Sequence, residues 1–217
     1  HLHRARLYNI LGRYPEADVD YREAVKLRPG VYEYESMRGR NLVDWGRSLA
    51  ERGKESPQQL EDAYDLFRVA YAKNKKNSDP IFQMLAIELL KKNDENIRYY
   101  QSLLKSRFPQ AVNRDVHTEL ASYLIDKGEI EDVWKMLASV IRRYPDYPRA
   151  YFSLSLYYRT IDNREAEEKA LEDAITRENG RELEYPWDVR DRRLISDSYN
   201  NIGDIYARTA ISGFFAE

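Results

Sequence analysis

The chain has no cysteine among its 217 residues. Disulfides, zinc thiolate sites and thiol nucleophiles are therefore excluded, while both the cytoplasm and the bacterial periplasm remain open as compartments. No apolar run approaches the roughly 18 residues that a membrane-spanning helix requires. Lys and Arg number 35 against 37 Asp and Glu, a net charge of -2. The basic excess expected of a protein whose main partner is nucleic acid is thus missing.

Catalytic motifs are missing as well. The sequence contains no glycine-rich phosphate loop, no nucleophile elbow and no metal-binding motif. His1 and His3 are two residues apart, the wrong spacing for one helix face, and we interpret His117 as a packing residue. We therefore predict no catalytic residues, no metal, no cofactor and no enzymatic activity.

What the chain does contain is a recurring pattern of glycine, aromatic or branched, small and proline residues. Two copies have the same offsets: Gly12, Tyr14, Ala17, Tyr21, Ala24 and Pro29, then Gly128, Ile130, Val133, Leu137, Val140 and Pro145. Leu120, Ala121 and Leu124 supply a first helix before the second copy. The unit is a helix, a turn, a second helix and a proline stop, in about 34 residues.

The apolar positions follow the 3.6-residue helical period throughout, and no segment alternates as a strand would. Small residues are expected where paired helices approach closely: Ala5, Gly46, Ala86, Ala121, Ser155 and Gly203. In the third unit one residue is missing, and we place that loss at its turn. Tyr32 to Arg38 lacks a loop-like composition, so we expect it to extend the adjoining helices.

This pattern resembles that of the tetratricopeptide-repeat family over nearly the whole chain, with about five and a half repeats. The resemblance implies an all-α, right-handed superhelical solenoid of antiparallel helix pairs, with first helices on a concave face that holds a partner segment. The expected organisation is one superhelix over 1–217, with units at about 1–31, 39–77, 79–111, 114–147 and 148–181, an insertion at 182–195 and a half unit at 196–217.

Two details refine the resemblance. The junctions Arg143 to Pro148 and Arg107 to Pro109 look like those of bacterial envelope repeat proteins. One subfamily holds a chaperone carboxylate with an asparagine just after the small residue of the first helix. Here that position holds Arg6, Arg47, Ile87, Ser122, Leu156 and Asp204, which argues against such a clamp.

The predicted partner-binding residues lie on the first helices and point away from the packed face. They are Arg47, Gln83, Ile87, Ser122, Arg149, Phe152, Arg159, Asn200 and Asp204. Basic residues flank an apolar middle, which suits a segment with apolar anchors and acidic flanks. In the alternative interpretation Ile87, Leu90 and Leu156 pack between neighbouring repeats.

The insertion carries Tyr185 and Trp187 among charged residues. They are candidate interface anchors, because departures from repeat length often map to functional loops. In the alternative interpretation the insertion covers a repeat edge. The half unit would leave one side of its helix open, which predicts either self-association or a longer native protein. The start at His1 also indicates a piece of a longer chain.

We conclude from the sequence that the chain is a protein–protein interaction scaffold that binds a protein or peptide segment. One alternative is the non-catalytic repeat region of a larger enzyme or of an envelope or secretion assembly. Another is a small-ligand or lipid carrier within the superhelix.

Overall fold

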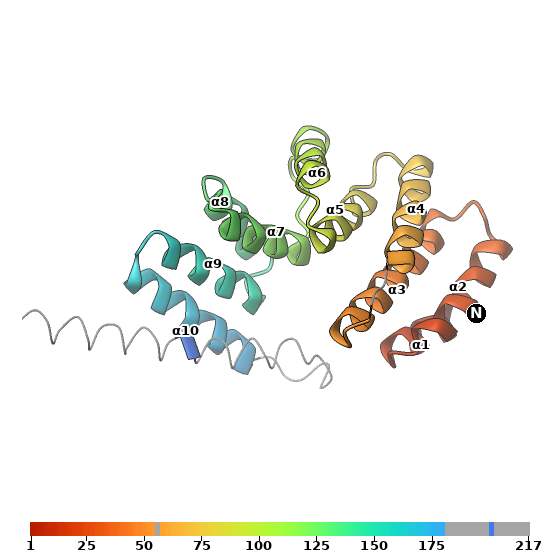
Figure 1. The fold of residues 1–217 in the computed structure, drawn as a ribbon, viewed down its shortest axis with the longest axis horizontal. Coiled ribbons are helices and arrows are strands. Elements are labelled where there is room, and N and C mark those ends of the chain that lie inside the picture. Colours follow the sequence, from red (N-terminus) through yellow and green to blue (C-terminus); the bar gives the residue numbers. More distant parts are fainter. Residues whose placement is uncertain (55–56, 181–199, 202–217) are drawn as a thin grey trace, which may run out of the picture. The chain divides into compact units, whose positions relative to one another are not determined.

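The computed structural model describes residues 1–54, 57–180 and 200–201 (Figure 1). Over these ranges the chain forms ten named helices and no strand. They are α1 (Leu2–Ile10), α2 (Tyr14–Leu27), α3 (Tyr32–Glu51), α4 (Pro57–Lys73), α5 (Asp79–Lys91), α6 (Asp94–Arg107), α7 (Arg114–Lys127), α8 (Val133–Arg143), α9 (Pro148–Thr160) and α10 (Arg164–Gly180). The predicted all-α fold is confirmed.

Two compact units divide the chain between Ala111 and Val112. The first contains α1 to α6 and the second begins with α7. Within each unit the helices pack in consecutive pairs, and α2 packs on α3, α4 on α5 and α8 on α9. Each unit is thus a solenoid of antiparallel helix pairs, as predicted. The single superhelix over 1–217 and its repeat boundaries stay predictions, and the predicted insertion at 182–195 and half unit at 196–217 fall almost wholly outside the described residues.

The five turns within these pairs share one backbone motif. Each contains one residue with a positive φ: Gly12, Gly53, Lys92, Gly128 and Asp162. The amide of the following residue donates to a carbonyl five residues earlier, as Arg13 N does to Tyr8 O at 2.8 Å. This bond satisfies a carbonyl that the helix end would otherwise leave unpaired. Three of the five turns use glycine because it adopts this conformation without steric cost.

Close approach between paired helices depends on small residues. The described members of the predicted set, Ala5, Gly46, Ala86, Ala121 and Ser155, are all buried. Large residues fill the space beside them, including Tyr21, Phe67 and Leu137. The predicted packing face of the first helices is therefore confirmed.

The extra residues before the second pair form part of a helix. Helix α3 runs unbroken for 20 residues, which confirms that Tyr32 to Arg38 extends a helix. Gly39 follows this extension and lies against the fully buried ring of Phe67 on α4. A Cβ at Gly39 would come 2.8 Å from Phe67 Cζ, so only glycine fits without a shift. The lengthened α3 thus packs closely against α4.

The third pair differs in α5 and keeps its turn. Lys92 precedes the buried Ile97 by five positions, as Gly12 precedes Ala17 and Gly128 precedes Val133. The missing residue therefore lies in α5, and its predicted place at the turn is wrong. Residues 84–89 of α5 are all buried, so this part of the helix is enclosed on every side. Five of these six residues are apolar, so a one-residue shift there exchanges one apolar contact for another.

The turn motif predicts opposite effects of two substitutions. Gly128→Ala should lower the free energy of unfolding by about 1 kcal/mol, since a Cβ at positive φ is strained although nothing lies within 4 Å of it. Lys92→Gly should raise that free energy by up to about 1 kcal/mol, because it removes the same strain. Urea unfolding measures both. Gly30→Ala, at a glycine without positive φ, is the control and should have little effect. Changes of the same sign at positions 92 and 128 would contradict the motif.

The packing predicts the effect of a buried charge. Ala121 is fully buried on α7, so Ala121→Glu should cost about 3 kcal/mol or more, as an unpaired buried charge does. Ala72→Glu, at an exposed alanine on α4, is the matched control. Thermal melting followed by circular dichroism compares the two. An unchanged melting temperature for Ala121→Glu would show that the helix register is wrong.

Candidate functional site

A row of polar side chains runs across the first helices of the first unit. In each unit we call the outward surface of the first helices, which are α1, α3 and α5 or α7 and α9, the first-helix face. On α1 and α3, Asn9 Nδ2 donates to Asn41 Oδ1 at 3.0 Å and lies 3.4 Å from Asp44 Oδ2. Asn41 is buried and donates in turn to the carbonyl of Tyr14 at 3.1 Å. These bonds fix the orientation of the amide groups before any partner arrives.

The row continues from α3 to α5 through an ion pair. Arg40 Nη2 lies 2.6 Å from Asp79 Oδ2. The other oxygen of Asp79 accepts a long hydrogen bond of 3.5 Å from the predicted site residue Gln83. Gln83 and Arg47 are both half-buried. The first unit therefore presents amide, carboxylate and guanidinium groups from three successive first helices on this face.

Ile87 does not belong to this surface. Its side chain is fully buried within the enclosed helix α5. The prediction that Ile87 contacts a partner is wrong, and the alternative interpretation, in which it packs between helices, holds. The one-residue shift in α5 explains the error, because it turns Ile87 from the outward face into the core.

In the second unit, three predicted residues remain at the surface of their helices. Ser122 on α7 donates to the carbonyl of Thr118 at 3.1 Å, so its hydroxyl already has an acceptor within the helix. Arg149 and Phe152 on α9 are half-buried. Together they offer one cation and one aromatic ring, the two side-chain types enriched at interface centres.

Arg159 forms an ion pair with another residue of the chain. Its Nε lies 2.7 Å from Glu167 Oε1, which joins α9 to α10. Glu167 is only 1% exposed. It occupies the position held by Ala17 and Val133 in other second helices. Arg159 therefore offsets a buried charge, and its exchange would disturb the fold as well as any binding.

The remaining predicted site residues are at the chain's end. Asn200 is exposed. Asp204, Tyr185 and Trp187 lie outside the described residues, as does most of the half unit proposed for self-association. Their roles stay predictions.

Sequence analysis missed a set of buried carboxylates that pair across helices of the first unit. Asp20 on α2 accepts from Arg4 on α1 with both oxygens at 2.6 Å. Asp18 Oδ1 lies 2.7 Å from Arg38 Nε, and Glu35 Oε1 lies 2.5 Å from Lys73 Nζ. The hydrogen bond from Arg4 holds the pKa of Asp20 below its ordinary value. The partners are 16 to 38 residues apart, so no local spacing reveals them.

The junction between α8 and α9 is tied by two tyrosines. Tyr147 donates its hydroxyl to Asp115 Oδ1 at 2.7 Å, and Tyr151 donates to the carbonyl of Pro145 at 2.9 Å. The guanidinium of Arg114 lies 4.9 Å from the centre of the Tyr147 ring, and that of Arg177 lies 3.8 Å from the Tyr151 ring. Burial, followed by the charge of Asp115, raises the pKa of Tyr147. The aromatic residues of this junction thus join α7, α9 and α10.

No cluster of three or more His, Asp or Glu suited to a metal occurs in the described ranges. His117 Nδ1 lies 2.7 Å from the carbonyl oxygen of Asn113, at the start of its own helix, and the ring is half-buried. This agrees with the interpretation of His117 as a packing residue. Within residues 1–54, 57–180 and 200–201, no helix is both long and apolar enough to cross a membrane.

The paired helices, positive-φ turns and small contact residues define a class, the α-solenoid built from helix-turn-helix repeats. Residues 1–30 match the family model described as tetratricopeptide repeat. A crystal structure of MamA, 15% identical, covers 81% of this chain and 94% of its own, with a TM-score of 0.59. TTC0263, a thermophilic TPR protein in Thermus thermophilus, is 19% identical and covers 78% and 89%, with a TM-score of 0.52. No curated protein matches the sequence significantly. The chain thus has the fold of these solved proteins, and its residues 1–30 match one tetratricopeptide repeat.

The environment of His117 predicts a pH dependence of stability. Burial lowers the pKa of the imidazole in the folded chain below its ordinary value of 6.5. Protonation therefore favours the unfolded chain, so stability should be full above pH 6.5 and should fall as the pH drops below it. The free energy of unfolding at about pH 7.5 and at about pH 5.5 should differ less in His117→Gln than in the wild type. Equal differences in both proteins would contradict the assignment.

Proposed function

We propose that this protein is a non-catalytic interaction scaffold that binds an extended segment of a partner protein on its first-helix face. The observation that carries the proposal is the hydrogen-bonded row of Asn9, Asn41 and Asp44, extended by the Arg40–Asp79 pair. A preformed row costs little ordering entropy when a partner binds, so more of the contact energy appears as affinity.

The chemistry of the row suits a peptide. Asparagine amides both donate and accept, which matches the alternating amide and carbonyl groups of a peptide backbone. The cations at Arg47 and Arg149 suit acidic side chains, and the ring of Phe152 offers apolar contact area. The proposed partner is therefore a protein segment with carboxylates and at least one apolar anchor.

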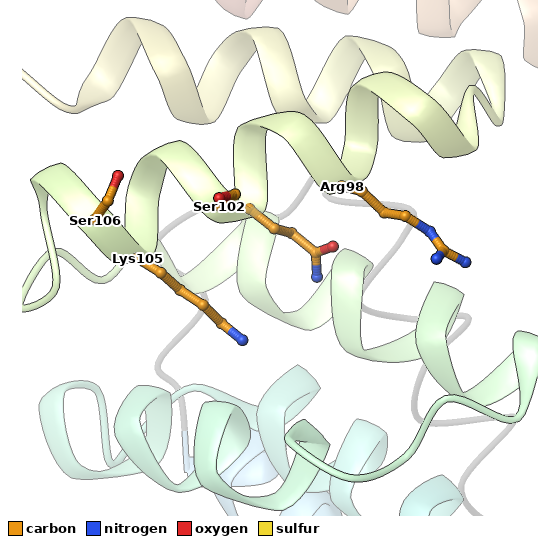
Figure 2. Close-up of a pocket in the computed structure, with 5 residues that line it drawn as sticks. Arg98, Ser102, Lys105 and Ser106 are labelled. Carbon is orange, nitrogen blue, oxygen red and sulfur yellow. The ribbon is translucent and has the colours of Figure 1, made fainter.

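The alternative of a repeat region within a larger enzyme or envelope assembly uses the same binding surface, and the Arg143 to Pro148 junction is its motivation. The carrier alternative requires an apolar cavity. The surface hollow along α6 does not provide such a cavity, because it is lined by polar and charged side chains, among them Arg98, Gln101 and Lys105 (Figure 2).

The proposal is tested by crosslinking pulldown from the source cell, followed by affinity measurements with the captured partner. Arg149→Glu should weaken binding about two- to fivefold, an effect that should shrink at high salt, because exposed ion pairs contribute about 0.2–1 kcal/mol each. Lys169→Glu on α10 makes the same charge change at an exposed site and is the control. Arg159 is left unchanged because of its pair with Glu167. Loss of binding in the Lys169 variant alone would place the surface on the second helices and overturn the proposal.

A further inference from the structure

The hydroxyl of Tyr21 on α2 has no hydrogen-bond partner within the part of the chain that the structure describes. The side chain is only 4% exposed and packs with Ala5 and Ala17. Tyr21 Oη is not one of the fully buried atoms that lack a partner, so solvent reaches it. A tyrosine hydroxyl at the end of a buried ring usually finds an acceptor. This accessible donor is therefore a candidate contact for a ligand.

The Tyr21 hydroxyl lies among charged side chains of the first-helix face. Helix α2 packs on both α1 and α3, so Tyr21 is placed between these two helices (Figure 1). Met37 on α3 packs against the Tyr21 cluster and accepts a hydrogen bond from Arg6 Nη2 on α1 at 3.7 Å. Burial raises the pKa of Tyr21, and the charges of Arg6, Asp44 and Arg40 also act on it. The hydroxyl and the Arg6 guanidinium therefore share the surface between α1 and α3.

Arg6 has no carboxylate partner among the described residues. Its hydrogen bond goes to the thioether of Met37, which is a weak acceptor. Arg40, by contrast, is paired with Asp79 at 2.6 Å. Arg6 is exposed and precedes Asn9 by three residues, so the two share one side of α1. Arg6 thus extends the hydrogen-bonded row with a cation that can still bind an anion.

We propose that Arg6 and Tyr21 together bind one acidic side chain of the partner segment, an inference that rests on the proposed function. Arg6 pairs with the carboxylate, and the Tyr21 hydroxyl donates a hydrogen bond to one of its oxygens. Because the ring of Tyr21 is already fixed by packing, this donor loses little freedom on binding. The charge of Asp44 on the same surface disfavours a second acidic residue beside the first. The segment therefore carries a single Asp or Glu at this point.

The charge balance of the surface favours a carboxylate over a phosphoryl group. A phosphoryl group carries about two negative charges at neutral pH, so Asp44 would repel it more strongly than a carboxylate. A carboxylate can come from an acidic side chain or from the end of a chain. We favour the side chain, because Arg6 occupies the position at which the chaperone-binding subfamily has its clamp asparagine. The test separates the two sources.

The test begins with a phage-displayed library of twelve-residue peptides selected against the wild-type protein. Enriched peptides are synthesised with a fluorescent label and an amidated carboxyl end, so that every carboxylate is an acidic side chain. In anisotropy measurements, replacing the acidic residue by its amide should weaken binding about two- to tenfold. Arg6→Gln should cause a similar loss. The two changes together should cost no more than one of them, because both remove the same pair.

Tyr21→Phe separates binding from folding, because it removes the hydroxyl and keeps the ring. It should weaken peptide binding about two- to tenfold and leave the melting temperature unchanged, since no hydrogen bond within the chain is lost. Tyr147→Phe is the matched comparison. Its hydroxyl donates to Asp115 within the fold, so this variant should melt at a lower temperature. Arg28→Gln removes another exposed arginine of the first unit and should bind the peptides as the wild type does.

The outcomes distinguish this inference from the proposed function. Peptides that bind Arg6→Gln and Tyr21→Phe as tightly as the wild type would overturn the inference and leave the proposed function intact. Equal losses in the Arg6 and Arg28 variants would do the same. Each peptide is also made with a free carboxyl end, and a gain in affinity that Arg6→Gln abolishes would assign the site to a chain terminus instead. If no library peptide binds the wild type, both the inference and the proposed function are contradicted.

Discussion

Each helix pair reverses direction through one residue with a positive φ, and this constraint sets the register of the packing that follows. Counted from Gly12 or Gly128, the buried residues of the second helix fall five, nine and twelve positions later. Asp162 obeys the same count although it is not glycine. Because the turn hydrogen bonds join the end of the first helix to the start of the second, the two helices cannot slip past one another. Small residues such as Ala5 then meet the second helix at its closest approach.

The same register makes exceptions informative. Where the count reaches a buried position, an apolar residue is expected, and two positions break this rule in different ways. Glu167 is buried in place of an alanine or valine and is matched by Arg159. Such a pair adds little net stability, because desolvation of both charges offsets their attraction. In α6 the count reaches the half-exposed Gln101, and the buried Tyr100 one position earlier supplies the large core residue. Both exceptions are therefore explained by packing within the helix pair.

The polar side chains on the first-helix face are held in fixed orientations by hydrogen bonds and ion pairs, and several of them are partly exposed. The buried Asn41 accepts a hydrogen bond from Asn9. Asp79 forms an ion pair with Arg40 and accepts a hydrogen bond from Gln83. Side chains of one helix therefore position those of the next. Ion pairs of buried carboxylates, such as Asp20 with Arg4, hold helices that carry the row against second helices. A scaffold of this kind gains affinity from rigidity, because the chain does not have to order these groups when a partner binds.

Much of this fold follows from sequence alone, because the period of apolar and small residues is a local property. Helix pairs, the turn at Gly128, the close contact at Ala121 and the extension of α3 can all be predicted from spacing. Tertiary structure decided the rest. Only packing shows that α5 is enclosed and takes Ile87 inward, or that Arg159 pairs with Glu167 rather than with a partner. Pairs such as Glu35 with Lys73 join residues 38 positions apart, and sequence carries no period at that distance. Local periodicity determines which face of a helix is apolar, whereas the neighbour that covers a polar residue is settled only when the helices meet.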